Sequence, residues 1–415
     1  MARKMKDSGI EWIGEIPEGW EVVPIKRLCT MQAGKNLTSE QIAPEGTYPV
    51  YGGNGIRGFF SDYNCDGQFL TVGRQGALCG NVHKINGKVW ATEHAVITTP
   101  SSYTILDFLY YLLIGMDLNQ YVSSTAAQPG LAVGTLLNLK TCYPCSTLEQ
   151  TQISNYLNTK CSEIDVMLTK TRSSIEEYKK LKQAVITQAV TKGVRGKREM
   201  KDSGVDYIGQ IPAKWVLGKL RNVGDTQNGI SKSSEFFGKG FPFVSYSDVY
   251  KNYSLPFAVS GLVESTPEEQ ERYSVKEGDI FFTRTSETIE EVGFSCVCEE
   301  DIPNATFAGF LIRVRPFSDR LYTPYAKYYF RSTHLRFYRV KEMNLVTRAS
   351  LGQSLLKSMP VLLPPLEEQK EIANYLDAKC AEIDRLIAKK EQLVKELESY
   401  KKGLIYEVVT GKREV

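Results

Sequence analysis

The sequence predicts an α+β fold in which two similar, strand-rich globular domains are separated by two long helices packed as an antiparallel coiled coil. Three observations predict it: a long amphipathic helix motif occurs twice, a leader segment occurs twice, and short β-like runs fill the region between each leader and its helix. Joined end to end, the copies would form a closed ring, so we expect a circular, pseudo-twofold arrangement with neighbouring termini. The predicted boundaries are 1–146 and 200–364 for the domains with their leaders, and 147–199 and 365–415 for the helices.

The leader opens each copy. Residues 5–17 read Met-Lys-Asp-Ser-Gly-Ile-Glu-Trp-Ile-Gly-Glu-Ile-Pro, and residues 200–212 repeat this pattern at an offset of 195, which Trp20 and Trp215 keep. The helix motifs are related by an offset of 219, so the second central region is longer by 219 − 195 = 24 residues. Gly-Lys-Arg-Glu stands both before the second leader and at the C-terminus, which is why the two copies would join into a ring.

The two central regions alternate runs rich in Val, Ile, Tyr, Phe and Thr with Gly- and Asn-rich turns, a pattern typical of β-strands. We predict one helix after the strands of each region and expect its paired tyrosines to pack in the core. The predicted strands are 47–51, 68–72, 95–98, 243–245, 279–282 and 310–314, the helices are 106–115 and 324–333, and the tyrosines are Tyr110, Tyr111, Tyr328 and Tyr329.

The two long helices are predicted from apolar spacing. Apolar residues recur at steps of three and four, with Lys, Glu and Ser on the other faces, as in a coiled-coil seam. An ordinary core helix is the alternative, but duplication at matched register favours a pair. Thr147 with Gln150 has capping-box spacing, Pro365 suits a first turn, and Asn158 and Asp377 are expected to restart each helix before a run of ~30 residues, about 45 Å. The predicted interface residues are Ile164, Leu168, Ile175, Tyr178, Val185, Ile383, Ile387, Leu393, Leu397, Tyr400 and Leu404.

Composition narrows the class of protein. A net charge of +3 means that any nucleic-acid affinity has to come from a local patch. Nine cysteines without framework spacing predict reduced thiols in a cytoplasmic protein. Cys142-x-x-Cys145 has no matching second pair, and three histidines are too few for a clear metal site, so we expect no metal. The N-terminus is not a signal peptide, and no apolar run approaches the ~20 residues of a membrane span.

A search for catalytic motifs finds none that fits. Gly53-x-Gly55-x-x-Gly58 matches a dinucleotide fingerprint formally, but strand-like residues follow where a phosphate-binding helix should begin. The sequence holds no phosphate-binding Gly-x-x-x-x-Gly-Lys-Ser/Thr loop, no Asn-Pro-Pro-Tyr methyltransferase motif and no Gly-x-Ser-x-Gly or His-Glu-x-x-His. We therefore expect a binding protein that is not itself an enzyme.

Polar residues on turns after the predicted strands suggest a DNA-reading surface. Arg can bind guanine O6 and N7, Gln can bind adenine N6 and N7, and Glu can accept from cytosine N4. Each residue alone is typical of a solvated surface, but paired placement in two duplicated regions favours a reading role, and cations at the joint could hold phosphates. The candidate base-reading residues are Asn54, Arg57, Arg74, Gln75, Thr92, Glu93, His94, Tyr246, Arg284, Thr285, Ser286, Glu287 and Thr288, and the joint cations are Lys192, Arg195, Lys197 and Arg198.

The duplicated motifs resemble a known family. Leu-Glu-(Glu)-Gln followed by Ile-Ala/Ser-Asn-Tyr-Leu and Glu-Ile-Asp, ending in Val-Thr-(Lys)-Gly, is similar to the conserved regions of type I restriction–modification specificity subunits. The leaders resemble the same family, as do residues 48–55, 73–76 and 92–95, which look like parts of its target recognition domains. The resemblance covers essentially the whole chain, although the first copy carries extra residues at 192–195.

The resemblance implies a non-catalytic DNA reader. Each domain would recognise one half of a bipartite, asymmetric target, and the helix pair would set the gap between the halves. Two modification subunits would dock on the helices and methylate adenines with S-adenosylmethionine, and restriction subunits would translocate and cut using ATP and Mg. The alternatives are a stand-alone DNA methyltransferase or nuclease, and a coiled-coil scaffold that does not bind DNA.

Overall fold

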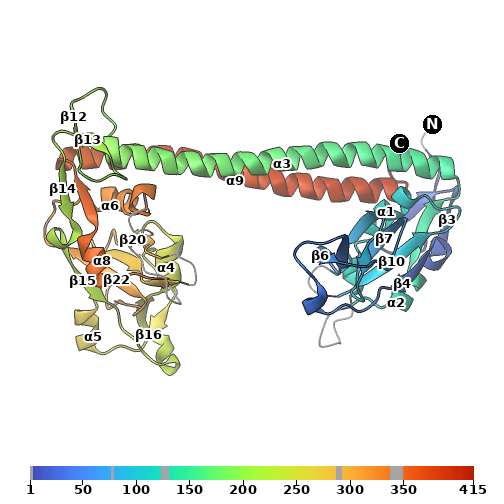
Figure 1. Cartoon of the computed structure of the whole chain (residues 1–415), viewed down its shortest axis with the longest axis horizontal. Helices are drawn as coiled ribbons and strands as arrows, with labels where there is room; N and C mark the ends of the chain where they lie inside the picture. Colours follow the sequence, from blue (N-terminus) through green and yellow to red (C-terminus); the bar gives the residue numbers. More distant parts are fainter. Residues whose placement is uncertain (1–2, 76–78, 123–129, 287–291, 337–348) are drawn as a thin grey trace. The chain divides into compact units, whose positions relative to one another are not determined.

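The computed structural model describes residues 3–75, 79–122, 130–286, 292–336 and 349–415. The chain divides into two compact units, of which unit 1 comprises Met1–Arg172 and Glu391–Val415 and unit 2 comprises Ser173–Lys390. Each unit therefore contains one leader, one strand-rich domain, the first part of the long helix that follows that domain, and the last part of the other long helix (Figure 1). This is the circular order that the repeated leader and helix predict.

In its described part, unit 1 consists of short, mostly antiparallel strands and two short α-helices. Its strands are β1 Met5–Asp7, β2 Glu15–Pro17, β3 Trp20–Pro24, β4 Cys29–Ala33, β5 Tyr48–Gly52, β6 Gly55–Phe60, β7 Gln68–Gly73, β8 Val82–Asn86, β9 Trp90–Ala91, β10 Ala95–Pro100 and β11 Lys140–Pro144, and its short helices are α1 Leu106–Gly115 and α2 Val133–Asn138. The main sheet has the order β4-β10-β7-β8, all antiparallel. A second sheet, β6-β5-β9, pairs β5 with β6 antiparallel and with β9 in parallel.

Unit 2 repeats this topology. Its strands are β12 Met200–Asp202, β13 Gln210–Pro212, β14 Val216–Lys219, β15 Gly224–Asn228, β16 Phe237–Val244, β17 Leu262–Val263, β18 Ile280–Thr283, β19 Thr285–Ser286, β20 Ser295–Val297, β21 Thr306–Phe307, β22 Leu311–Pro316, β23 Ala349–Ser350 and β24 Pro360–Leu363, and its short helices include α4 Tyr246–Lys251, α5 Pro267–Arg272, α6 Thr323–Tyr329 and α8 Gln353–Ser358. The main sheet runs β15-β22-β18-β20 and the second runs β17-β16-β21, again with one parallel pair. The predicted strands and short helices are therefore confirmed, with shifts at their ends.

Equivalent backbone contacts within each unit show which residues of the two units correspond. Gly34 and Gly229 are related by the leader offset of 195, and each lies against a neighbouring backbone segment of its own unit. An added Cβ would stand 2.2 Å from the carbonyl oxygen of Ala91 at Gly34 and 2.2 Å from that of Phe307 at Gly229. Gly73 pairs with Ala95 as Thr283 pairs with Leu311, which raises the offset to 283 − 73 = 210. Fifteen of the 24 extra residues thus enter between these points, where unit 2 has α4 and α5.

The long helices α3 Thr147–Lys192 and α9 Leu366–Val409 are each continuous. The expected restarts at Asn158 and Asp377 are therefore wrong. Both side chains instead accept a hydrogen bond from a tyrosine of the neighbouring domain, at 2.9 Å from Tyr111 and 2.6 Å from Tyr328. The helices also end before the predicted boundaries at 199 and 415, because Gly193 and Gly411 take the left-handed conformation (φ +77° and +71°).

The first turns of the long helices differ from the predicted capping box. Ser146, not Thr147, places its hydroxyl by the backbone N–H of Glu149, at 3.4 Å. Gln150 is fully buried and its side chain turns away from the cap, accepting from the N–H of Ile105 at 2.8 Å and donating to two carbonyl groups. Gln369 does the same in unit 2, where it accepts from the N–H of Tyr322 at 2.8 Å. These glutamines tie each long helix to its own domain.

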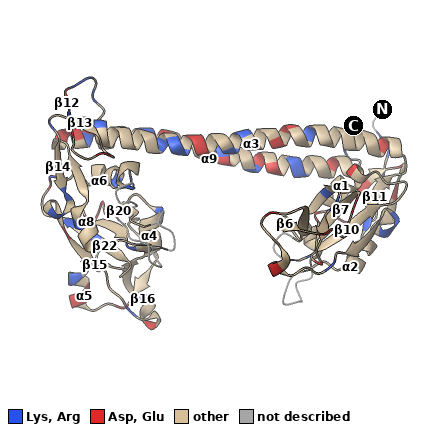
Figure 2. Ribbon diagram, viewed as in Figure 1, with Lys and Arg blue, Asp and Glu red and all other residues tan. Residues whose placement is uncertain are grey.

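The helix segments pack antiparallel within each unit. In unit 1 Lys401 Nζ lies 2.7 Å from Asp165, and in unit 2 Lys182 Nζ lies 2.6 Å from Asp384. Both residues of one pair correspond to the other pair at the offset of 219, so the two seams are equivalent. Lys and Arg positions are interspersed with Asp and Glu positions along both helices (Figure 2).

Nine of the eleven predicted interface residues are buried or partly buried, and two are not. Leu393 and Tyr400 are 43% and 53% exposed, so their placement on the seam is wrong. The seam steps by three and then four residues through Val394, Leu397 and Lys401, which match Ile175, Tyr178 and Lys182 at the offset of 219. A strict heptad places Leu393 and Tyr400 one residue too early and turns them outward.

The leaders close each core onto the helices. Ile13, Ile16 and Trp20 are buried in one cluster with Val408 and Val409 at the end of α9. Trp215 is buried likewise with Ile186 and Val190 at the end of α3. The two chain ends therefore lie in the same unit (Figure 1). Within the described ranges, no helix is both long enough and apolar enough to cross a membrane.

Candidate nucleic-acid interface

Three turns meet at one edge of unit 1. They are the turn after β5, the residues that follow β7, and the residues between β9 and β10. The backbone N–H of Arg74 donates to the carbonyl of His94 at 3.0 Å, and the N–H of Thr92 donates to the carbonyl of Tyr51 at 2.9 Å. A Cβ at Gly73 would lie 1.9 Å from the carbonyl oxygen of Gly53, so only glycine allows this approach. The structure thus brings the predicted unit 1 residues together.

These turns carry buried polar atoms without hydrogen-bond partners. In the part of the chain that the structure describes, they include Arg74 Nε, Thr92 Oγ1, Glu93 Oε2 and His94 Nδ1. Glu93 and His94 form a pair, with Oε1 and Nε2 3.0 Å apart, which uses only one polar atom of each. Buried polar groups are normally paired, so these atoms lack partners that such groups usually have. Thr92 is fully buried and cannot reach a base, whereas the Glu93 and His94 side chains are each 36% exposed and can meet a ligand.

Two residues that were not singled out from the sequence join this edge. Asn81 donates from Nδ2 to Oδ1 of Asn54 at 2.7 Å, which orders the exposed Asn54 on the β5–β6 turn. His83 Nε2 has no hydrogen-bond partner among the described residues, and burial lowers the pKa of His83. Arg57 is exposed on β6, with its stem against Gly52. Gln75 is half-buried and bridges to Gly130.

The equivalent turn of unit 2 uses the same backbone frame. The N–H of Arg284 donates to the carbonyl of Phe310 at 2.9 Å, and the carbonyl of Arg284 accepts from the N–H of Leu351 at 2.7 Å. In unit 1 the carbonyl of Arg74 accepts from Leu131 at 2.9 Å. Arg74 and Arg284 therefore occupy one position in the two copies.

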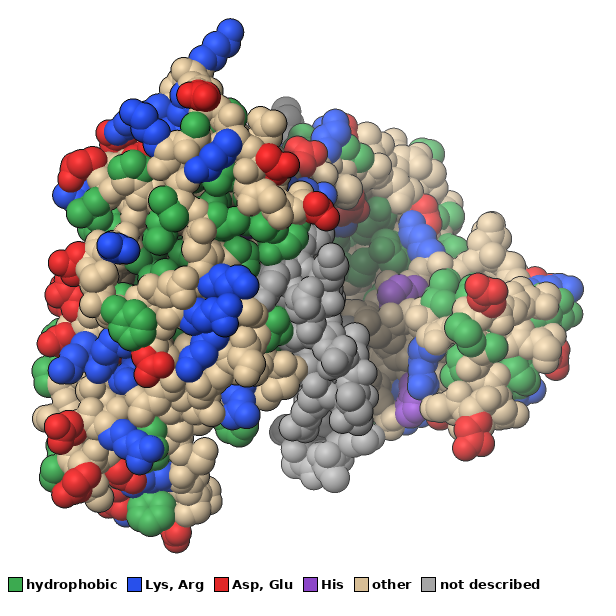
Figure 3. All heavy atoms as spheres, turned by 60° about the vertical axis from the view of Figure 1, so that its left-hand side comes forward, with side chains coloured by type: hydrophobic (Ala, Val, Ile, Leu, Met, Phe, Trp, Pro, Cys, Tyr) green, Lys and Arg blue, Asp and Glu red, His purple; other side chains and the backbone are tan. Residues whose placement is uncertain are grey.

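The other predicted residues of unit 2 stand differently. Thr285 and Ser286 form β19, which pairs with β23. Glu287 and Thr288 lie outside the described residues. Tyr246 begins α4, where its ring stacks on Tyr250 and its buried hydroxyl has no partner within the described chain, so it faces inward. Figure 3 shows Lys and Arg side chains gathered on a face of unit 2 and histidine side chains on the surface of unit 1.

The joint cations lie between the end of α3 and the second leader. Two of them form ion pairs with acidic residues at the start of α9. Arg198 binds the buried carboxylate of Glu368 and lies over the ring of Trp215. Arg195 makes two 2.8 Å contacts to Glu371, and Lys192 donates to the carbonyl of Gln210. Lys197 is exposed. The structure therefore groups these residues with the helix ends and not with Arg284.

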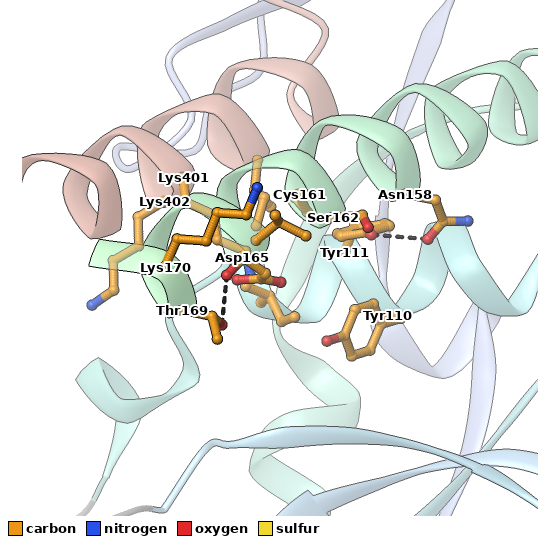
Figure 4. Close-up of a pocket in the computed structure, with 13 residues that line it drawn as sticks. Tyr110, Tyr111, Asn158, Cys161, Ser162, Asp165, Thr169, Lys170, Lys401 and Lys402 are labelled. Atoms are coloured by element: carbon orange, nitrogen blue, oxygen red, sulfur yellow. Dashed lines mark hydrogen bonds and ion pairs between the residues drawn. The ribbon is translucent and has the colours of Figure 1, made fainter. Parts of the chain in front are cut away.

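A cavity of about 670 Å³ lies in unit 1 between α1, α3 and the last part of α9. Figure 4 shows Tyr111, hydrogen-bonded to Asn158, at one side of it and Lys401 beside Asp165 at the other. Its walls are thus the residues that join the domain to the helices. Among the residues described, no three His, Cys, Asp or Glu side chains are grouped as a metal site would require.

Comparison with known proteins gives a consistent family. Residues 17–177 and 212–397 match the family model described as the type I restriction modification DNA specificity domain. Over 418 residues the chain is 25% identical to the type I restriction enzyme MjaVIII specificity subunit of Methanocaldococcus jannaschii, covering 96% of this chain and 93% of the relative. It is 23% identical over 408 residues to the EcoKI specificity subunit of Escherichia coli K12, covering 90% and 84%. A 45% identical match to the EcoprrI specificity subunit of Escherichia coli spans 121 residues, 28% of this chain and 30% of that one.

Solved structures share the fold. One, described as the structural basis of complex assembly and conformational transition of the type I R-M system, has a TM-score of 0.71 at 15% identity and covers 96% of this chain and 99% of its own. The HsdS subunit from Thermoanaerobacter tengcongensis has a TM-score of 0.50 at 17% identity, covering 96% and 98%. At these identities the similarity concerns the fold alone, that is, two strand-rich domains and two long helices in one chain.

Proposed function

We infer the function of this chain from one premise, which is that it belongs to the type I restriction modification DNA specificity family. We propose that it is the DNA-specificity subunit of a type I restriction–modification complex. Each strand-rich domain is then a target recognition domain that reads one half of a bipartite DNA site. The helix pair sets the gap between the halves.

The observation that carries this proposal is the shared position of Arg74 and Arg284. Both arginines are held by the same two backbone hydrogen bonds, at the end of the equivalent strand, in two units of one topology. The neighbouring turn differs, with Glu93 and His94 in unit 1 and Gly309 and Phe310 in unit 2. A common frame with unlike side chains is what two different half-sites require, because base edges are read by individual side chains.

The partners follow from the same proposal. Two modification subunits dock on the long helices and methylate adenines, holding the S-adenosylmethionine themselves, and restriction subunits supply the ATP- and Mg-dependent steps. This chain binds no cofactor of its own and is not catalytic. A net charge of +3 supports the division, since a subunit this near neutrality leaves much of the phosphate contact to its partners.

The test is a methylome. A host that carries the modification subunits is mapped for methyladenine with the wild-type chain, with Arg74→Ala and with Arg284→Ala. We expect the wild type to give two unlike half-sites, and each variant to lose or relax only the half-site read by its own unit, because a bidentate arginine contributes about 1–3 kcal/mol of discrimination. Arg27→Ala is the control and should leave the motif unchanged, because Arg27 is exposed between β3 and β4, outside both the proposed reading turns and the long helices.

Two results would contradict the proposal. If Arg74→Ala prevents assembly with the modification subunits while Arg27→Ala does not, Arg74 has a folding role. If the isolated chain binds S-adenosylmethionine, the alternative of a stand-alone methyltransferase gains support. A gel shift with duplex DNA, with and without modification subunits, separates a DNA reader from a coiled-coil scaffold.

A further inference from the structure

Phe310 of unit 2 occupies the position that His94 occupies in unit 1. Each residue stands immediately before the equivalent main-sheet strand, β22 or β10, and its carbonyl oxygen accepts a hydrogen bond from the backbone N–H of the equivalent arginine. The distances are 2.9 Å for Arg284 to Phe310 and 3.0 Å for Arg74 to His94. The offset between the two residues is 216, which neither the leader nor the helix repeat would give.

The side chains at this position are polar in unit 1 and apolar in unit 2. His94 pairs with Glu93 and leaves Nδ1 without a partner among the described residues, so unit 1 offers donors and acceptors. In unit 2 glycine replaces the glutamate, and a Cβ at Gly309 would lie 2.3 Å from the hydroxyl of Ser231. Phe310 is 65% exposed. An exposed apolar side chain alone means little. Phe310, however, is hydrogen-bonded through its backbone to Arg284, so it lies beside a candidate base-reading residue.

We propose that Phe310 is a specificity-determining residue of the second half-site and that it contacts the C5 methyl group of a thymine in the major groove. This inference rests on the proposed function and deepens it. Thymine is the one base that presents an apolar group in the major groove, and phenylalanine is among the side chains that contact it. Arg284, held on the adjoining turn, is of the type that reads guanine from the same groove.

Deoxyuridine tests the contact, because it pairs like thymine but lacks the methyl group. Once the methylome has identified the half-sites, the full complex with its modification subunits is titrated with duplexes in which each thymine of the second half-site is replaced in turn. The wild-type complex should lose affinity about tenfold at one position, in line with the discrimination expected for a base-edge contact. Phe310→Ala should bind the thymine and deoxyuridine duplexes equally at that position.

Phe317→Ala is the matched control. Phe317 is 66% exposed and follows the other end of β22, so its removal deletes a similar apolar surface without touching the turn. It should keep the tenfold discrimination, and so should His94→Ala. Both variants also show whether the fold tolerates a lost surface ring.

The outcomes separate this inference from the proposed function. If no deoxyuridine substitution weakens wild-type binding, or if Phe310→Ala still discriminates against deoxyuridine, the methyl contact is refuted while half-site reading stands. A Phe310→Ala complex that weakens equally on all sequences would indicate a wedge between bases or a general contact, and it too refutes the proposal. A complex that neither binds nor methylates any bipartite site refutes the proposed function itself.

Discussion

Replacing Gln369 by alanine should loosen the junction between α9 and the domain of unit 2. The buried side chain of Gln369 accepts from the N–H of Tyr322 at 2.8 Å and donates to the carbonyls of Arg320 and Pro364 at 2.8 and 2.9 Å. It thereby holds Tyr322, the residue before α6, and Pro364, two residues before α9, in one network. Gln150 makes the equivalent three bonds in unit 1.

The cost can be estimated from these bonds. Each hydrogen bond contributes about 1 kcal/mol net, and the substitution removes three, so the expected loss is about 3 kcal/mol. The substitution also leaves the N–H of Tyr322 without its partner. Gln369 is only 1% exposed, so water does not readily replace it. Since 1.4 kcal/mol is tenfold in an equilibrium, the local opening reaction should become about 100-fold more favourable.

Hydrogen exchange followed by mass spectrometry measures this directly. In Gln369→Ala, peptides covering 320–326 should exchange about 100-fold faster, whereas peptides covering 103–109 should keep their wild-type rate. Gln150→Ala should give the reverse pattern. Gln152 is exposed on α3, so Gln152→Ala controls for the change of residue type and should affect neither region.

An equal effect of Gln369→Ala on both regions would contradict the division into two units, each with its own clamp. An unchanged rate in 320–326 would contradict the hydrogen-bond network itself.

Two glycines near the end of α9 give opposite predictions, both read from thermal unfolding. Gly411 has φ +71°, and an added Cβ would stand 2.5 Å from the ring of Pro17, so Gly411→Ala should destabilise unit 1 by more than the ~1–2 kcal/mol of the backbone term alone. Gly403 lies within the helix with nothing within 4 Å of an added Cβ, so Gly403→Ala should stabilise it by about 1 kcal/mol. A stabilised Gly411→Ala would mean that the leader does not pack on the helix end as described.

The repeats made the architecture predictable. The leader and the helix are matched without gaps, so two offsets suffice to deduce two similar units and a circular order. Local patterns also placed the short helix α1 at its observed bounds. The offset of 219 also predicts the helix interface correctly, because the residue that corresponds to Ile175 at this offset is Val394 and not Leu393. Tyr400 was assigned to the interface because it is apolar, whereas the heptad position is occupied by Lys401.

The candidate site was less accessible to sequence reasoning. Arg74 and Arg284 are related by an offset of 210, between the two repeat offsets, because insertions enter gradually through the variable regions. The equivalence of His94 and Phe310 depends on backbone hydrogen bonds between distant segments, which no local pattern reports. The role of Gln150 was hidden for the same reason, since a capping box and a long-range clamp share one spacing.

If the helix pair holds the two reading domains apart, the gap between the half-sites depends on the length of the long helices. Two turns, about seven residues, are deleted from one long helix, and methyladenine is mapped beside the wild type in the presence of the modification subunits. We expect the bases of both half-sites to stay the same and the tolerated gap between them to change. An unchanged gap, or a change in the bases of either half-site, would contradict this expectation.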